Sequence, residues 1–118
     1  MSKAEMECIF CKIIAGQARS EMVYQDEWVS AFHDIHPVAP VHILIVPNQH
    51  IESMNDLRPE DEQVIGRLFT TAALIAAQEG VRDSGYRLII NTGPHAGQMV
   101  YHLHLHLIGG QPMRFRMG

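Results

Sequence analysis

The sequence predicts an α+β fold, in which an antiparallel sheet of about five strands carries one long helix on one face. Short runs of β-branched and aromatic residues lie on both sides of a single long stretch with helical periodicity. Near the end of the chain, residues 101–108 alternate histidine and leucine. A strand of that kind has one apolar face, and a helix can cover it.

The composition is that of one ordinary globular domain, and we expect residues 1–118 to form a single domain. Of the 118 residues, 47% are hydrophobic and 19% are charged, and no apolar run approaches the ~20 residues that a membrane-spanning helix needs. The formal charge of −4 argues against a nucleic-acid partner, because nucleic-acid binders gather Lys and Arg on one face. The polar first residues do not resemble a secretory signal, so we expect a cytoplasmic protein without a membrane partner.

A short helix and a hairpin come first. Residues 8–15 fit a helical turn that Gly16 could cap. Residues 23–25 and 28–34 are rich in β-branched and aromatic side chains and flank Asp26-Glu27. This arrangement indicates two strands joined by a tight turn.

An apolar strand and the long helix follow. The strand, residues 42–46, should stop at Pro47, because proline cannot donate a hydrogen bond to a ladder. The helix should begin at Pro59, where three acidic residues fall in the first turn, and end before Gly80. Six apolar residues recur at three- and four-residue spacing and should pack on the sheet: Ile65, Leu68, Phe69, Ala72, Ile75 and Ala76.

The last two predicted strands are residues 86–92 and 101–108, with a loop between them. Side chains of a strand alternate between its faces. One face of the last strand therefore carries His102, His104 and His106, and the other carries Leu103, Leu105 and Leu107. Because the leucines supply the buried side, we expect the histidine face to be exposed.

Three interpretations of the histidine face compete. A solvated polar face is the plainest, but three identical titratable groups in a row are unusual there. A catalytic metal held by histidines two residues apart is the second, but no Asp or Glu that could complete such a site occurs within the strand or the ten residues after it. We prefer nucleophilic and acid–base chemistry by the imidazoles themselves, because neutral imidazole is abundant near pH 7 and can attack phosphorus. His104, with a neighbour on each side, is the favoured nucleophile.

The alternating pattern resembles the signature of the histidine triad (HIT) family. Further segments are similar, in order and spacing, to its Hint branch, the purine nucleoside phosphoramidases: residues 31–35, 40–42, 46–47, Asn91 and Gly97-Gln98. The resemblance covers residues 8–113. It implies a HIT-type fold and a homodimer whose two sheets join. It also implies hydrolysis of the P–N bond of purine nucleoside 5′-phosphoramidates through a nucleotidyl-histidine intermediate.

The resemblance also implies roles for individual residues. The catalytic positions are His104, His106, His42 and His102, with His104 forming the intermediate. The positions matched to nucleotide binding are Phe10, Ile13, Phe32, His33, Asp34, Ile35, Asn91, Gly97, Gln98 and Met99. Asp34 would accept hydrogen bonds from the ribose hydroxyls, and Phe115 would reach the partner subunit's site. From the residues alone, the apolar positions fit a plain core equally well, and Asn91 fits a turn.

Met99 departs from the family pattern. The animal Hint enzymes carry a serine at this position, and a thioether cannot donate a hydrogen bond to a leaving group. We expect hydrolysis to survive this change, with an altered choice of leaving group. Two other functions stay open beside phosphoramidate hydrolysis. One is hydrolysis of dinucleoside polyphosphates or nucleotidyl transfer, and the other is a purine-nucleotide binding or sensor protein with little turnover.

The amino-terminal cysteines suggest a metal site. Cys8 and Cys11 form a C-x-x-C pair in a chain without other cysteines, and in a reducing compartment such a pair favours metal binding or redox chemistry. One pair is a weak signal by itself. The resemblance to bacterial triad proteins implies a structural zinc that His50 and His102 complete. Such a closed Cys2His2 site would hold the amino-terminal turn against the sheet and would take His102 out of proton chemistry.

Overall fold

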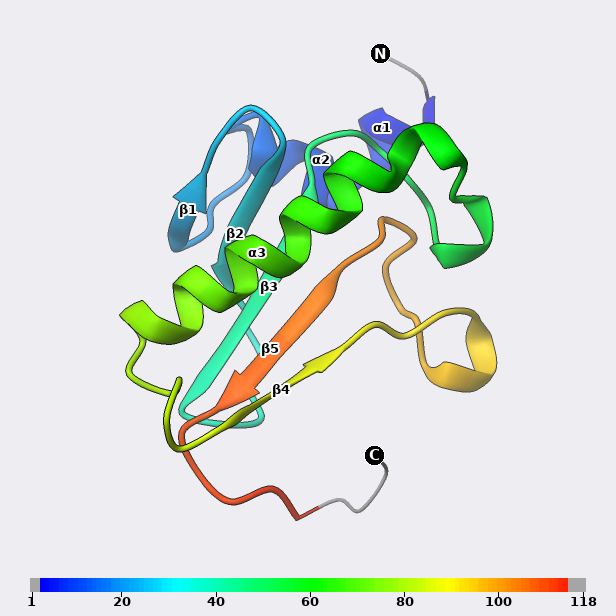
Figure 1. Ribbon diagram of the computed structural model, residues 1–118. Helices are drawn as coiled ribbons and strands as arrows, with labels where there is room; N and C mark the ends of the chain where they lie inside the picture. Colours follow the sequence, from blue (N-terminus) through cyan, green and yellow to red (C-terminus); the bar gives the residue numbers. More distant parts are fainter. Residues whose placement is uncertain (1–2, 115–118) are drawn as a thin grey trace.

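One five-stranded antiparallel sheet, in the order β1-β2-β3-β5-β4, carries the long helix α3 across one face (Figure 1). The computed structural model describes residues 3–114, so Phe115 lies outside the described residues. The strands are β1 (Met22–Gln25), β2 (Val29–His33), β3 (Val41–Pro47), β4 (Tyr86–Ile89) and β5 (Leu105–Gly109). The helices are α1 (Lys3–Glu7), α2 (Ile9–Ile14) and α3 (Glu62–Gln78), with 3-10 turns η1 (Met54–Asp56), η2 (Pro59–Asp61) and η3 (Pro94–Ala96). The predicted α+β architecture is confirmed. Within residues 3–114 no helix is both long and apolar enough to cross a membrane.

The two faces of β3 pack against different helices. Ile43 and Ile45 join the core beneath α3, where the three leucines of the alternating segment also lie. Leu44 and Val46 point to the opposite face and meet Phe10 of α2. Because side chains alternate along the strand, one central strand serves both layers. Helix α2 thus covers part of the face that the sequence predicted to be exposed.

Helix α3 departs from the prediction at two places. Its first turn is the separate 3-10 turn η2, in which Asp61 accepts a hydrogen bond from the backbone N–H of Arg58 at 3.0 Å. Four residues of the predicted stripe are buried, and Ile65 is partly buried against the core. The prediction that Phe69 belongs to the buried stripe is wrong, because its side chain is 43% exposed. Val64 and Thr71 are buried instead. The buried stripe is thus rotated away from Phe69, which lies at its edge.

The alternating segment forms a shorter strand than predicted. Strand β5 begins at Leu105, which pairs with Ile45 of β3. Beyond that pair, β3 approaches Pro47, which has no N–H for a ladder. The backbone N–H of Leu103 donates instead to the carbonyl of Ile51 at 2.7 Å. The alternation survives outside the ladder, since Leu103 is buried in the same core as the later leucines.

Candidate active site

The histidine face is covered, which corrects the prediction that it would be exposed. His102 is fully buried, and His104 is only 8% exposed. Phe10 of α2 covers both rings, with ring centroids 5.9 Å from His102 and 5.2 Å from His104, in edge-on contact. Two histidines of the segment therefore lie in a nearly dry environment, while His106 is half-buried.

A backbone hydrogen bond fixes the tautomer of His104. Its Nδ1 lies 2.8 Å from the carbonyl oxygen of His102. A carbonyl can only accept, so Nδ1 carries the proton and Nε2 keeps its lone pair. Burial lowers the pKa of His104, while the His102 carbonyl and the charge of Asp34 oppose that shift. His104 is thus a neutral imidazole with one free ring nitrogen near pH 7, which is the form a nucleophile requires.

His42, His106 and Asp34 form a hydrogen-bonded network beside His104. The backbone N–H of Val38 donates to His42 Nδ1 at 3.1 Å, so neutral His42 carries its proton on Nε2. That Nε2 lies 2.9 Å from His106 Nδ1 and 3.3 Å from a carboxylate oxygen of Asp34. His106 then carries its proton on Nε2, a buried atom without a hydrogen-bond partner in the described part of the chain. The network therefore presents an unpaired N–H donor.

The protonation of His42 and His106 follows from their burial. Burial is the largest cause that lowers the pKa of His106, to about 4, and the neighbouring histidines add to it. Burial also lowers the pKa of His42, against the opposing charge of Asp34. Both rings are therefore neutral near pH 7, and His106 can act as a donor without carrying a charge.

The same three side chains could be taken for a metal site. Asp34, His42 and His106 each offer a ligand atom, and these atoms lie within 4.8 Å of one another. The sequence argument found no acidic ligand, because Asp34 is far from the triad along the chain. The hydrogen bonds argue against a metal here. To ligate through Nε2, His42 would have to carry its proton on Nδ1, which faces the donor N–H of Val38.

The residues matched to the base and ribose do lie together. Phe10, Ile13 and Phe32 are buried in one cluster, and the rings of Phe10 and Phe32 are 5.3 Å apart. Ile35 is 81% exposed, and with Ile13 it lines a cavity of about 790 Å³ that residues 16–22 complete. His33 is half-buried at the end of β2.

Asp34 already has partners within the chain. One of its carboxylate oxygens accepts a hydrogen bond from the backbone N–H of His36 at 2.8 Å, and the other lies beside His42. Its side chain is 17% exposed, so part of the carboxylate can still meet a ligand.

Among the residues matched to nucleotide binding, Gly97, Gln98 and Met99 lie on or at the end of one braced loop. The side chain of Gln98 is buried, accepting from the N–H of Gly93 at 3.0 Å and donating to the carbonyls of Glu52 at 2.8 Å and Val100 at 3.1 Å. Only its backbone is left for a ligand. Asn91 is half-buried before this loop, and Gly97 is exposed with a φ of 81° that favours glycine. Met99 is 89% exposed at the end of the loop.

A second cluster contains the four predicted metal ligands. One ligand atom each of Cys8, Cys11, His50 and His102 lies within 4.8 Å of the others. Cys8 Sγ is 3.3 Å from His102 Nδ1, and Cys11 Sγ is 3.3 Å from His50 Nδ1 and 3.5 Å from His102 Nδ1. Tetrahedral zinc at ordinary bond lengths separates its sulfur and nitrogen ligands by about 3.6 Å. The spacing of the donor atoms fits that ion.

The protonation of the cluster fits a cation as well. His102 Nε2 donates to the carbonyl of Pro47 at 2.8 Å, so its Nδ1 lone pair faces the cysteine sulfurs. Burial, followed by the neighbouring Cys8, raises the pKa of the Cys11 thiol to about 12. A divalent cation between the sulfurs would remove that cost. Cys8 also accepts a hydrogen bond from the Cys11 N–H as the N-cap of α2, a role that the sequence argument missed.

Comparison with known proteins places the chain in a family. The model of the HIT domain matches residues 15–113. The purine nucleoside phosphoramidase of Escherichia coli strain K12 is 56% identical over 107 residues, which cover 91% of this chain and 90% of that protein. A 14 kDa zinc-binding protein of Brassica juncea is 45% identical over 115 residues, covering 95% of this chain and all of that one.

A solved structure of the same family has a similar fold. The crystal structure of a HIT family hydrolase from Legionella pneumophila is similar with a TM-score of 0.92 and 41% identity, covering 95% of this chain and 100% of that one. Both the family match and the fold agree with the resemblance inferred from the histidine pattern. The chain therefore belongs to the HIT domain family and is a hydrolase of that family.

Proposed function

We propose that the protein hydrolyses the P–N bond of purine nucleoside 5′-phosphoramidates and releases the nucleoside monophosphate and an amine. The observation that carries this proposal is the hydrogen bond from His104 Nδ1 to the His102 carbonyl, which leaves Nε2 of a neutral, buried ring free to attack. The name of the Escherichia coli relative, a purine nucleoside phosphoramidase, supports the choice of substrate.

The proposed reaction has two displacements. His104 Nε2 attacks the phosphorus, the P–N bond breaks, and the departing nitrogen takes one proton from solvent and leaves as the amine. Water then attacks the phosphorus of the nucleotidyl-histidine and loses one proton to solvent, the bond from phosphorus to His104 Nε2 breaks, and the monophosphate is released. The unpaired Nε2–H of His106 can donate to a phosphate oxygen, and His42 holds His106 in the required tautomer. His102 helps through its carbonyl rather than through its ring.

Binding of the nucleotide follows the matched positions. The cluster around Phe10, Ile13 and Phe32, with the exposed Ile35, would hold the purine. The exposed part of Asp34 would accept from the ribose hydroxyls. The remaining matched positions would lie near the ribose and phosphate: His33, Asn91, Gly97, the backbone of Gln98, and Met99.

Zinc and assembly belong to the same proposal. Cys8, Cys11, His50 and His102 would hold one structural zinc, and the zinc-binding protein of Brassica juncea supports this. The metal would cross-link α2 to the segment after β3, and it would take no part in the displacement. We further propose that residues 1–118 act as one HIT domain in a cytoplasmic homodimer.

The test is product formation from a defined substrate. The protein is incubated with the tryptamine phosphoramidate of AMP, and release of AMP is followed by chromatography. His104→Ala should lose turnover but still bind AMP, because the change removes the nucleophile and little of the purine pocket. His95→Ala, which removes an exposed imidazole from η3, is the matched control.

Two results would contradict the proposal. Absence of AMP at micromolar enzyme would leave a binding protein, and faster turnover of diadenosine triphosphate would favour dinucleoside polyphosphates as substrates. If His104→Ala lost less than about tenfold in kcat, equivalent to about 1.4 kcal/mol, the nucleophile would be a different residue.

A further inference from the structure

The carbonyl of His102, which orients His104, lies ahead of the first residue of β5 and is held from outside the ladder. The His102 ring donates through Nε2 to the carbonyl of Pro47 at 2.8 Å. The next backbone N–H, that of Leu103, donates to the carbonyl of Ile51 at 2.7 Å. The position of the nucleophile therefore depends on the chain around Pro47 and Ile51.

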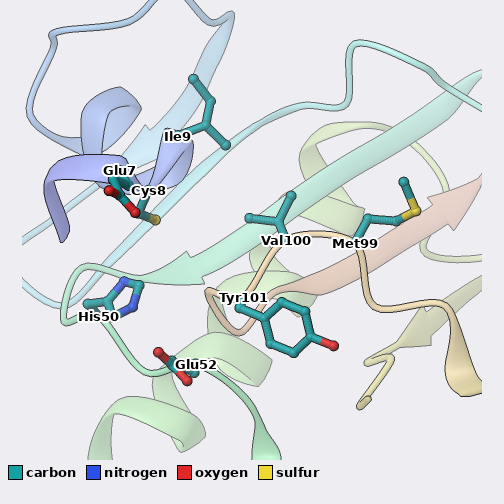
Figure 2. Close-up of a pocket in the computed structure, with 8 residues that line it drawn as sticks. All are labelled: Glu7, Cys8, Ile9, His50, Glu52, Met99, Val100 and Tyr101. Carbon is teal, nitrogen blue, oxygen red and sulfur yellow. The ribbon is translucent and has the colours of Figure 1, made fainter. Parts of the chain in front are cut away.

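Three hydrogen bonds end on main-chain carbonyls of residues 47–52, which we name the support segment. Besides the two bonds just described, the side chain of Gln98 donates to the carbonyl of Glu52 at 2.8 Å. Figure 2 shows His50 and Glu52 on this segment and Tyr101 on the neighbouring loop. The support segment thus holds the loop that supplies the acceptor for the nucleophile.

Asn48 anchors the support segment to β2 and to the turn before it. Its Oδ1 accepts a hydrogen bond from the hydroxyl of Ser30, a fully buried residue, at 2.6 Å. Its Nδ2 donates to the carbonyl of Asp26 at 2.8 Å, and its backbone N–H donates to the carbonyl of Trp28 at 2.9 Å. These three contacts fix both the side chain and the main chain of Asn48.

One rigid peptide unit links Asn48 to His102. The carbonyl of Pro47 and the N–H of Asn48 belong to the same planar unit, and in a trans peptide they point in opposite directions. Because the N–H donates to Trp28, the carbonyl is aimed at the ring of His102. Rotation of this unit would weaken both hydrogen bonds at once. The orientation of the His102 ring therefore depends on how firmly Asn48 is held.

The turn that receives Asn48 is itself braced. One carboxylate oxygen of Asp26 accepts from the backbone N–H groups of Trp28 and Val29, at 2.7 and 2.8 Å. The other accepts from the hydroxyl of Tyr24 at 2.7 Å. The turn thus offers Asn48 partners in fixed positions, which is what a contact that positions another group requires.

We propose that Asn48 is a positioning residue for the nucleophile His104. Asn48 holds the carbonyl of Pro47, and that carbonyl holds the ring of His102. The main chain of His102 in turn holds the imidazole of His104. This inference rests on the proposed hydrolysis. A misplacement of about 1 Å can lower a rate by about 10²-fold even when it arises away from the reacting groups.

The first measurement is the kinetics of Asn48→Ala, which removes the two side-chain hydrogen bonds and keeps the backbone N–H. With the tryptamine phosphoramidate of AMP, kcat should fall about tenfold while KM stays within about twofold, because the residues matched to the nucleotide are untouched. An unchanged kcat, or a rise in KM alone, would overturn the inference.

Two variants serve as controls for that measurement. Asn55→Ala truncates an exposed asparagine in η1 and should keep the wild-type kcat. Ile75→Val weakens the core beneath α3 and should also keep it, so that a general loss of stability is separated from a loss of positioning.

The second measurement reads the histidine rings directly. In protein with isotope-labelled histidine, NMR follows the protons on His102 Nε2 and His104 Nδ1, which hydrogen bonds to carbonyls shield from exchange with water. Relative to the backbone amides of β3, both should exchange about tenfold faster in Asn48→Ala and at the wild-type rate in Ile75→Val. A loss of kcat without faster exchange would overturn the inference, because Asn48 would then act by another route.

The two measurements separate this inference from the proposed function. Wild-type kinetics and unchanged ring exchange in Asn48→Ala would overturn the inference and leave the hydrolysis standing. Faster ring exchange in Asn48→Ala, together with no AMP release by the wild-type protein, would uphold the positioning of the two rings and refute the hydrolysis.

Discussion

His104 combines burial with a fixed tautomer, and both affect the pH at which it can react. Its ordinary pKa would be about 6.5, and burial lowers that pKa in the folded chain. The hydrogen bond to the His102 carbonyl places the remaining proton on Nδ1. The reactive form is thus the one that predominates at neutral pH.

The first prediction is a low acid limit for kcat/KM. Protonation of His104 removes the nucleophile, and since its pKa is depressed, activity should stay level as pH falls through 6.5 and decline only below that value. The measurement is kcat/KM for a phosphoramidate between pH 4.5 and 8. A midpoint at or above pH 6.5 would show that the ring is not desolvated in the free enzyme.

Acid unfolding must be separated from that titration. The folded pKa of His106 is about 4, so between pH 6.5 and 4 the unfolded chain binds more protons than the folded one. Stability is therefore lost across this window as pH falls. Measuring the folded fraction at each pH by circular dichroism controls for that loss.

The second prediction concerns the carboxylate of Asp34. Asp34→Asn should raise KM more for ribonucleoside phosphoramidates than for 2′-deoxy ones, because a hydrogen bond to a charged acceptor is lost only where the 2′-hydroxyl exists. The wild-type protein should prefer the ribonucleoside substrate by about tenfold, and this preference should be smaller in Asp34→Asn. Steady-state kinetics on the matched pair gives the answer. If both substrates suffer equally, the contacts of Asp34 with His36 and His42 are its whole role.

Helix α2 depends on Cys8 in two ways, as its N-cap and as a candidate zinc ligand. Cys8→Ser separates these roles, because serine still caps a helix but does not ligate zinc in such sites. We expect one zinc per wild-type chain by elemental analysis, less in Cys8→Ser, and a lower Tm for the variant with hydrolysis largely kept. The free energy of unfolding of Cys8→Ala should be about 1 kcal/mol lower than that of Cys8→Ser, because alanine also removes the N-cap.

Two observations would end the zinc hypothesis. One is a wild-type protein that is metal-free as purified, and the other is a Cys8–Cys11 disulfide in reducing buffer. A chelator that stops turnover while the chain stays folded would instead indicate a catalytic metal.

Much of the element structure could be predicted because periodicity reports burial. The leucines of the alternating segment are buried as their spacing indicated, although β5 begins only at Leu105. The prediction for Phe69 failed because spacing alone does not say where an apolar stripe ends. The covering of the histidines was also missed, since nothing in the alternating segment itself indicates that Phe10 packs over it.

The sequence could name candidate site residues but not their protonation. The grouping of Cys8 and Cys11 with His50 and His102 came from a family resemblance, and the structure brings these four together. The tautomers could not be predicted, because they depend on the carbonyls of His102 and Pro47 and on the N–H of Val38. Nearly every residue has a backbone N–H and a carbonyl, so the sequence does not indicate which of these groups a histidine ring will meet.

At the scale of the molecule, the sheet ends in two outer strands, β1 and β4, within the described residues. The resemblance implies a homodimer whose sheets join, and the joining of two sheets requires an outer strand with unpaired backbone groups. Light scattering after gel filtration should give twice the 13.3 kDa of one chain, unchanged on dilution to low micromolar concentration. A mass equal to one chain would exclude any lending of the carboxy-terminal tail between subunits.

The acceptors that orient His102 and His104 are both main-chain carbonyls, those of Pro47 and His102. No side-chain substitution can delete a carbonyl, so mutation has no direct way to remove these two hydrogen bonds. Only changes that move the backbone can do so. Substitutions around this site therefore leave both hydrogen bonds in place as long as the chain path persists, even where they change the burial of the two rings.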